Sequence, residues 1–287
     1  MRQPRPGTAA KIPLVIRYTV LAIFVVGALF PLYWVFVSSI KPNADVFKLP
    51  PVWTFSPSLA NYRQILGMTN SSAGGTDFVR YAVNSTVIAV GTAIPSLLLG
   101  TLAAYGITRC RVRWGTKYMT AVLVGRLVPP AALLVPLFVL FSTFHLIDTQ
   151  LAVIITLMCF GLPFVIWMMS GFFSELPPEL DEAALVDGCS RLGALFRVIL
   201  PISAAGLVVT GLFVFLGGWN EFLIPLVLTE NNAQPIAVAI QSYVAGFNVQ
   251  WGPLFAASAL AFLPVIIVGA LAQRYLTRGF TSGAVKG

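Results

Sequence analysis

The chain has 287 residues, of which 57% are hydrophobic and only 10% are charged. Soluble domains carry about 25% charged residues, so this composition excludes an ordinary soluble domain. It also excludes a disordered chain, which requires low hydrophobicity and high net charge. The 18 basic residues exceed the 10 acidic ones, and with so few charges in total this excess indicates a membrane surface rather than nucleic acid.

Six apolar segments are long enough to cross a lipid bilayer, for which a helix needs about 20 residues. They are Tyr18–Ile40, Thr86–Ile107, Tyr118–Phe141, Leu151–Phe173, Ile202–Val227 and Leu254–Tyr275. The first is too long for a signal peptide and no small-residue cleavage site follows it, so we interpret it as a retained helix. The sequence therefore predicts an all-α, multi-pass membrane protein with an N-terminal tail (residues 1–17), a six-helix membrane domain (18–275) and a C-terminal tail (276–287).

The basic residues predict the orientation of these spans, because cytoplasmic loops carry more Lys and Arg than external loops. Thirteen lie in the N-terminal tail, at the C-terminal end and in the loops after the second and fourth spans, whereas four lie in the remaining loops. Both termini are therefore predicted to be cytoplasmic, which agrees with an even number of spans. Prolines inside most spans predict bent helices around a pathway, although proline is also common in membrane helices generally.

Familiar catalytic and nucleotide-binding motifs are missing from the sequence. It has no phosphate-binding loop, no G-x-G-x-x-G, no H-E-x-x-H and no C-x-x-C. Its three cysteines, at positions 110, 159 and 189, are not spaced like a zinc site or a disulfide framework. His145, the single histidine, falls in a predicted external loop and is interpreted as a surface residue. We therefore expect no catalytic residues, metal or cofactor on this chain.

Residues 175–201, between the fourth and fifth spans, are predicted to form two short helices joined by a sharp turn. Pro177 and Pro178 suit a helix start, and three acidic residues follow where the helix dipole favours negative charge. Gly188 stands where a C-terminal cap belongs, and Ser190 can cap a second helix that Pro201 ends. Four residues of the first helix are spaced to share one face: Leu180, Ala183, Ala184 and Asp187.

The charge of this loop indicates what it contacts. It carries five acidic and two basic residues, whereas helices that lie on a lipid surface are usually rich in Lys and Arg. We therefore interpret it as a compact knob that enters a cleft on a protein partner.

The same residues resemble the coupling motif of bacterial ABC-importer permeases, which reads E-A-A, three residues, G, nine residues, I-x-L-P. In this chain the motif is Glu182-Ala183-Ala184, then Gly188, then Val198-Ile199-Leu200-Pro201. Val198 replaces the usual isoleucine, and Cys189 stands where alanine is common in sugar importers. The change at Val198 is conservative, and neither departure removes the resemblance.

Two further stretches resemble carbohydrate permeases. The tetrapeptide Trp219-Asn220-Glu221-Phe222 is similar to a W-N-[DE]-F motif near the end of the fifth span. The last nine residues, Gly279–Gly287, are similar to a G-L-T-x-G-A-V-K-G tail, with Phe280 in place of leucine. From the first helix to the last residue, the chain resembles the maltose-importer type of inner-membrane permease subunit.

This resemblance implies a type I ABC-importer permease fold and a non-catalytic subunit of the bacterial cytoplasmic membrane. It implies a second, homologous permease, two ATP-binding subunits that carry the ATP and Mg²⁺, and an extracytoplasmic substrate-binding protein. The residues implied to couple to the ATPase are Glu182, Ala183, Ala184, Asp187, Gly188, Leu200 and Pro201. The tail is implied to reach the ATPase interface through Gly283, Lys286 and Gly287.

The substrate pathway and the binding-protein surface are less sharply defined. Arg126 lies nine residues after Lys117, about 13 Å into the membrane at 1.5 Å per residue, where it lines the route, forms a gate or pairs with the partner permease. The other pathway candidates are Trp219, Asn220 and Glu221, although Glu221 also suits an interfacial position. Polar candidates for external contacts lie in the loop Thr229–Gly252: Asn231, Asn232, Gln234, Gln241, Asn248 and Gln250.

Other functions remain open at this point. The same machinery could carry a non-sugar solute, such as a polyol, a glycerol phosphate or a peptide. A self-sufficient secondary transporter or channel is the alternative from another class, but it would need ion-coupling carboxylates in the membrane or an internal repeat. The leading prediction is half of the translocation pathway of an ATP-driven importer, for a sugar.

Overall fold

The computed structural model describes residues 13–68, 77–110, 112, 115–125, 127–245 and 248–283. Its long helices are α1 (Leu14–Ser39), α3 (Phe78–Arg109), α6 (Gln150–Glu175), α10 (Ala204–Asn220) and α13 (Trp251–Gly283). Its shorter helices are α2 (Ala60–Ile65), α4 (Gly115–Gly125), α5 (Pro130–Thr143), α7 (Glu179–Val186), α8 (Arg191–Ala194), α9 (Leu200–Ile202), α11 (Leu223–Leu228) and α12 (Ile236–Ala239). The remaining described elements are single helical turns at Asn43–Asp45, Leu195–Ile199 and Ile240–Tyr243. A hairpin is formed by two strands of two residues each, β1 (Val244–Ala245) and β2 (Asn248–Val249).

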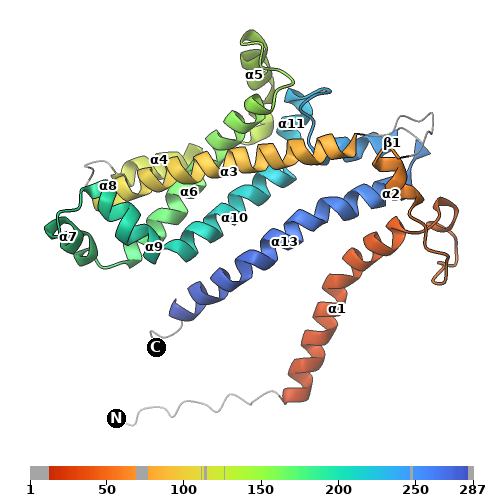
Figure 1. Cartoon of the computed structure of the whole chain (residues 1–287), viewed down its shortest axis with the longest axis horizontal. Coiled ribbons are helices and arrows are strands. Elements are labelled where there is room, and N and C mark those ends of the chain that lie inside the picture. The colour runs from red at the N-terminus through yellow and green to blue at the C-terminus, as the bar shows by residue number, and fades with distance from the viewer. Residues whose placement is uncertain are drawn as a thin grey trace, which may run out of the picture.

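The centre of the molecule is a layer of long helices. Helices α3, α6 and α10 pack side by side, and α4 lies against α6 (Figure 1). In lipid no hydrophobic effect drives helices together, so they associate by close packing, which small residues at the contact allow. Gly100 of α3 faces Val165 of α6, and Gly218 of α10 faces the backbone of Ala89 in α3. The glycines therefore set how closely the three helices pack.

The two ends of this layer carry different structures. Helices α7, α8 and α9 lie at the end where α3 and α6 finish, whereas α2 and the hairpin lie at the opposite end (Figure 1). In the hairpin, Val244 pairs with Val249 and Ala245 pairs with Asn248 in antiparallel register. The loop that resembles a coupling motif is thus separated by the length of the helices from the loops that the sequence predicts to be external.

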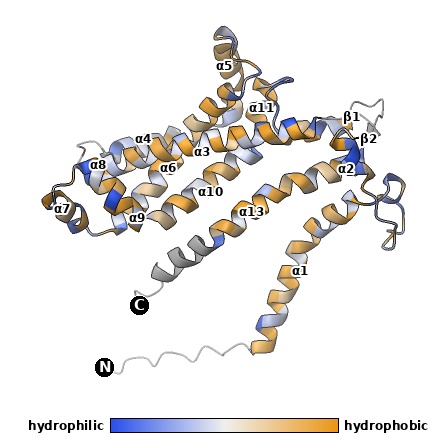
Figure 2. Cartoon of the chain, in the orientation of Figure 1, coloured by the Kyte–Doolittle hydropathy of each residue, from blue (hydrophilic) through white to orange (hydrophobic). Residues whose placement is uncertain are grey.

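Helix α1 stands away from the rest of the chain over most of its length (Figure 1). Its apolar window has no residue buried within the chain, and Figure 2 shows hydrophobic residues along its length. Only its C-terminal end is fixed, because the Asn61 side-chain amide donates to the carbonyls of Ser39 and Lys41 at 2.9 and 3.0 Å. The Lys41 ammonium lies over the Trp34 ring, 4.7 Å from its centroid. The exposed apolar surface of α1 must be covered by lipid or by another chain.

The mostly helical membrane fold is confirmed, and the number of spans remains a prediction. Within the described residues, four helices are long and apolar enough to cross a membrane: α1, α3, α6 and residues Trp251–Gln273 of α13. A fifth span results if Arg191–Ile202 and Ala204–Asn220, which meet at a bend of 84°, are counted together. The helix α13 continues to Gly283, beyond the predicted end of the sixth span at Tyr275.

Two of the predicted spans are broken rather than continuous. The segment Tyr118–Phe141 is divided between α4 and α5, and α5 begins at Pro130 directly after Pro129. Proline removes a backbone donor and restricts the residue before it, so a Pro-Pro pair interrupts a helix. The segment Ile202–Val227 is divided between α10 and α11, with Glu221 in an extended conformation between them. The two broken segments pack against each other through α5 and α11.

The arrangement gives a direct test of the predicted orientation. In a background without the three native cysteines, single cysteines at the exposed positions Ser142 and Ser242 should react with an impermeant thiol reagent added to intact cells. A cysteine at Val186, which is 87% exposed at the opposite end of the layer, should react only after the membrane is permeabilised. Labelling of Val186→Cys in intact cells would overturn the orientation.

Candidate functional site

The predicted two-helix loop is present, and its turn is made as expected. Helix α7 has Glu179, Asp181 and Glu182 in its first turn, where acidic groups complement the helix dipole. Gly188 has a φ of +83°, a left-handed conformation that glycine adopts without the steric cost of a Cβ. The Gly188 N–H donates to the Leu185 carbonyl and the Cys189 N–H to the Ala184 carbonyl, at 3.1 and 3.0 Å. These bonds satisfy carbonyls that the end of α7 would otherwise leave without partners.

The second helix begins as predicted and ends slightly later. The Ser190 hydroxyl accepts from the Gly193 N–H at 3.1 Å, so it is the expected N-cap. Pro201 does not end the helix: it lies inside α9, which runs to Ile202 before the bend. A proline ring clashes with the carbonyl four residues earlier, here that of Arg197. The wider π turn at Leu195–Ile199, which contains this residue, provides the altered hydrogen bonding that accommodates it.

The exposed face of the loop differs from the face that the spacing predicted. Ala184 is buried and Leu180 is half-buried, whereas Ala183 and Asp187 are exposed. Glu182 and Gly188 are exposed as well. The loop therefore presents an acidic tip with small residues, together with four exposed apolar side chains: Leu185, Val186, Leu192 and Phe196. Leu200 is half-buried and Pro201 is exposed at the base of the loop.

The predicted pathway residues do not share one site: Trp219 and Asn220 line a cavity of about 190 Å³ beside α12 and α13, whereas Glu221 lines a different cavity. Trp219 is 5% exposed, its indole N–H donates to the Ala261 carbonyl at 3.2 Å, and its ring stacks on Phe215. It therefore packs α10 against α13. The Asn220 amide donates to the Leu216 carbonyl of its own helix. Arg126 lies outside the described residues.

Glu221 lies at the break between α10 and α11 and lines a cavity of about 280 Å³. One carboxylate oxygen accepts from the N–H groups of Leu223 and Ile224, at 3.1 and 3.3 Å, and so caps α11. The remaining lining residues come from α3, α6 and α10: Thr92, Leu157, Phe160, Gly161, Phe164, Phe213, Val214, Gly217 and Gly218. We call this cavity the α10 pocket.

The α10 pocket has a polar group that the sequence did not indicate. Thr92 is 2% exposed, and among the described residues its hydroxyl has no hydrogen-bond partner. A buried hydroxyl without a partner is costly unless a ligand or water satisfies it. Three phenylalanine rings, one hydroxyl and one carboxylate therefore converge on a space of small-molecule size.

The candidate external contacts have different surroundings. Gln241 is exposed. The Gln250 side chain accepts from the Gln64 amide at 3.2 Å, which ties the loop to α2. Asn248 lies in β2, opposite Ala245. Of the two whose side chains the structure describes, Gln241 is displayed at the surface and Gln250 makes an internal contact.

The sequence analysis missed a carboxylate that holds the Thr229–Gly252 loop. Asp148, with a φ of +58°, accepts through Oδ1 from the backbone N–H groups of Glu230, Asn231, Asn232 and Ala233, at 3.0 to 3.2 Å. Its Oδ2 accepts from the Asn232 side chain at 2.9 Å. The Asn84 amide adds donations to the Asn232 and Gln234 carbonyls. The start of the Thr229–Gly252 loop is therefore fastened to α3 and to the α5–α6 connection.

The pKa of Asp148 predicts how this attachment responds to acid. Burial alone raises the pKa, but the N–H groups of Asn232, Glu230, Ala233 and Asn231 outweigh burial and lower it to about 2. A lowered folded-state pKa gives stability that is present above the unfolded value near 4 and is lost only as the pH falls toward 2.

Amide hydrogen exchange of Glu230–Ala233 should therefore show pH-independent protection between pH 8 and pH 5, after correction for intrinsic rates. Asp148→Asn should accelerate exchange about tenfold, the effect of losing about one charge-assisted hydrogen bond. A loss of protection near pH 6 would show that a different group holds the loop.

Within the described residues, no three His, Cys, Asp or Glu side chains lie close enough to hold a metal ion.

The tail residues Lys286 and Gly287 lie outside the described residues, and Gly283 is the last residue of α13. The structure thus offers two sites for function: the exposed loop of α7–α9 and the α10 pocket.

Comparisons with known proteins agree with this arrangement. Residues 96–282 match the family described as "Binding-protein-dependent transport system inner membrane component". The trehalose/maltose transport system permease protein MalG of Thermococcus litoralis is 32% identical, over 99% of each chain. The sulfoquinovosyl glycerol transport system permease protein SmoH of Agrobacterium fabrum is 31% identical, over 95% of this chain and 94% of its own length.

A solved structure supports the fold. In a bacterial ABC transporter involved in the import of the acidic polysaccharide alginate, a chain with 21% sequence identity superposes with a TM-score of 0.76, over 95% of this chain and 99% of its own length. The matched residues include the loop of α7–α9 and most of the α10 pocket. The chain therefore belongs to the family of inner-membrane components of binding-protein-dependent transport systems, and it is a multi-pass permease subunit of an ABC importer.

Proposed function

We propose that this chain forms half of the solute pathway of an ATP-driven importer and receives the motion of the ATPase through the loop of α7–α9. The observation that carries the proposal is the loop itself: a turn with positive φ at Gly188 and an acidic, exposed tip. A protein cleft is the environment in which an exposed knob of small and acidic residues gains buried contacts. The residues proposed to enter or support that contact are Glu182, Ala183, Ala184, Asp187, Gly188, Leu200 and Pro201.

The α10 pocket supports a sugar as the solute. Phenylalanine faces can stack on the apolar face of a sugar ring, and the Thr92 hydroxyl and Glu221 carboxylate can bond its hydroxyl groups. The names of the trehalose/maltose and sulfoquinovosyl glycerol relatives favour the same class. Of the earlier pathway candidates, Glu221 lines the α10 pocket, whereas Trp219 packs against α13 and Asn220 bonds to its own helix.

The partners follow from the family and from surfaces left uncovered. A binding-protein-dependent importer works with ATPase subunits and a substrate-binding protein; two ATP-binding subunits, which carry ATP and Mg²⁺, are proposed here. A second, homologous permease would complete the pathway and cover part of the exposed surface of α1. Gln241, and with it Asn248 and Gln250 of the same loop, would face the binding protein.

The solute class is tested by binding rather than by the permease alone. The cognate binding protein should bind trehalose, maltose or another oligosaccharide with a Kd in the micromolar range or tighter, and the reconstituted complex should import the same compound on addition of ATP. Binding of a polyol, a glycerol phosphate or a peptide in place of sugars would leave the importer assignment intact but would exclude a sugar as the solute. Uptake in vesicles that lack the ATPase would indicate a secondary transporter or channel.

The C-terminal tail is proposed to contact the ATPase through Gly283, Lys286 and Gly287. Deletion of Gly283–Gly287 removes no apolar span, so insertion and assembly should remain intact. Transport, or its regulation by the ATPase, should fall by a fewfold, the size of a typical allosteric coupling. Unchanged uptake and unchanged ATPase regulation in the truncated complex would remove the tail from the mechanism.

A further inference from the structure

The base of the α7–α9 loop contains a polar junction that no motif in the sequence marks. The Tyr105 hydroxyl of α3 donates to Asp181 Oδ1 of α7 at 2.6 Å. Arg109, in the last turn of α3, lies with its Nε 3.4 Å from Asp181 Oδ2. The side chains of this ion pair are 9% and 10% exposed. Three residues from two helices thus meet with little exposure to solvent.

Arg109 also reaches a third helix. Its Nη2 donates to the carbonyl of Phe173 at 2.6 Å and to that of Leu176 at 2.7 Å. Phe173 lies in the last turn of α6 and Leu176 is the residue that follows the helix, where backbone acceptors have no partners within the helix. The planar guanidinium can hold a carboxylate and two carbonyls at once, which an ammonium group cannot do with the same geometry. Arg109 therefore joins the ends of α3 and α6 to the first helix of the loop.

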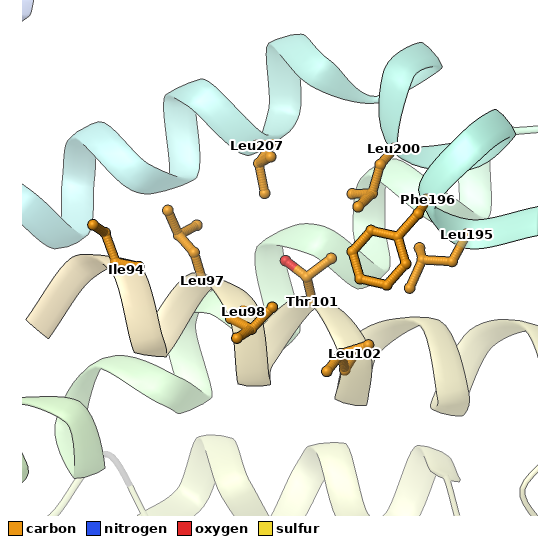
Figure 3. Close-up of a pocket in the computed structure, with 9 residues that line it drawn as sticks. All are labelled: Ile94, Leu97, Leu98, Thr101, Leu102, Leu195, Phe196, Leu200 and Leu207. Atoms are coloured by element: carbon orange, nitrogen blue, oxygen red, sulfur yellow. The ribbon is translucent and has the colours of Figure 1, made fainter. Parts of the chain in front are cut away.

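The second helix of the loop is supported differently. Between it, α3 and α10 lies an apolar cavity of about 240 Å³, lined by Thr101 and eight apolar side chains. Figure 3 shows Phe196 and Leu200 on one side of this space and Leu98 and Thr101 on the other. The first helix is thus fixed to α3 by one hydrogen bond and one ion pair. The second helix packs Leu195 and Ile199 into the apolar core, although another part of it faces unfilled space. A force on the loop therefore reaches the membrane helices through the polar junction as well as through this apolar packing.

Two of the helices joined at this junction, α3 and α6, also line the α10 pocket. Thr92 lies on α3, and Phe160, Gly161 and Phe164 lie on α6. A buried ion pair is weak evidence for stability, because its desolvation opposes its attraction, and it more plausibly fixes geometry. This makes the junction suited to hold one relative position of loop and helices.

We propose that Arg109 and Asp181 are positioning residues that fix the coupling loop to α3 and α6 and transmit the motion of the ATPase to the α10 pocket. This inference rests on the proposed function of the loop. It assigns to Tyr105 a supporting role, in which its hydroxyl orients the Asp181 carboxylate.

The test measures pocket access rather than transport, so the solute need not be known. In the assembled complex without native cysteines, Gly217→Cys places a thiol in the α10 pocket, where a Cβ meets no atom within 4 Å. Its rate of modification by N-ethylmaleimide is measured with and without MgATP in the presence of the cognate binding protein. The ratio of the two rates reports coupling, while co-purification of the ATPase and its basal hydrolysis report assembly.

Arg109→Gln and Asp181→Asn should reduce the MgATP response about fivefold or more, the lower range of allosteric couplings, with assembly and basal hydrolysis retained. The double variant should be no worse than the more impaired single variant, because the two residues act as a unit. Asp181→Glu should retain most of the response. Arg80→Gln is the matched control, because Arg80 forms an exposed ion pair with Asp77 at the other end of α3.

Tyr105→Phe keeps the aromatic packing against Phe173 and removes only the hydroxyl, so it remains informative if the charged variants fail to assemble. A reduced response in this variant supports the proposal, and a wild-type response in it or in an assembled Arg109→Gln complex overturns it. If the MgATP response is reduced in Gly188→Val but normal in the junction variants, the loop keeps its proposed coupling role and only this inference fails. If the parent Gly217→Cys complex shows no MgATP response, the result contradicts the proposed function itself rather than the role of the junction.

Discussion

Replacing Gly188 by valine is expected to leave the membrane helices inserted but to weaken attachment of the ATP-binding subunits. The φ of +83° at this position costs an ordinary residue about 1–2 kcal/mol, and a β-branched residue is a conformational outlier there. Space is not the obstacle, because a Cβ at Gly188 meets no atom within 4 Å. The turn between α7 and α8 should therefore rearrange, and a bulky group would stand at the tip that enters the cleft.

The measurement is co-purification of the ATPase with the variant, together with hydrolysis stimulated by the binding protein in vesicles. Gly188→Asn is the matched control, because asparagine tolerates the left-handed conformation and should retain more attachment than valine. Glu182→Lys should act in the same direction as valine, since it reverses an exposed charge at the tip. Wild-type values for both Gly188→Val and Glu182→Lys in both assays would show that this loop is not the coupling element.

Two neighbouring glycines of α10 are expected to give opposite outcomes when each is replaced by leucine. A Cβ on Gly218 would lie 3.1 Å from the Ala89 Cα in α3, so the backbones would have to separate. Overpacking of this kind costs about 1–3 kcal/mol or more. Gly218→Leu should therefore lower the thermal stability and the yield of assembled complex. Gly217→Leu meets no such contact, so assembly should be normal.

Comparing these two variants distinguishes an effect on helix packing from an effect on transport. Gly217 and Gly218 both line the α10 pocket, but only Gly217 can accept a side chain there without moving α3. Gly217→Leu should lower uptake strongly while basal ATP hydrolysis and thermal stability stay near wild type. Normal uptake by a well-assembled Gly217→Leu complex would exclude the α10 pocket from the solute route.

The coupling loop could be predicted from sequence because its determinants are local. Pro178, Gly188 and Ser190 act on backbone within a few residues of themselves, and the turn and the Ser190 cap were confirmed. The apolar segments were predictable for the same reason, since hydrophobicity is read over one window at a time. The breaks at Pro129 and Glu221 were harder to predict from sequence. A proline is common inside membrane helices, and a glutamate near the end of a span is ordinarily interfacial.

Contacts between distant residues could not be predicted from these signals. Tyr105 and Asp181 are 76 positions apart, and Asp148 and Asn232 are 84 apart. Each residue also satisfies a local role, so nothing in the sequence required a distant partner: Asp181 complements a helix dipole, and Arg109 contributes to the basic cytoplasmic loops. The packing of Trp219 against α13 could not be predicted either, because a motif gives position along a helix but not which neighbour its side chain packs against.

The central claim, that the α7–α9 loop contacts the ATPase, is tested most directly by cross-linking. A single cysteine at Val186, 87% exposed on the loop, is introduced in a background where Cys110, Cys159 and Cys189 are replaced, and a thiol-to-amine cross-linker is added to the purified complex. The claim predicts a covalent product between this chain and an ATP-binding subunit, and none from a matched cysteine at Ser142. A complex in which the ATPase co-purifies but cross-links only to the Ser142 cysteine, and not to the one at Val186, would contradict it.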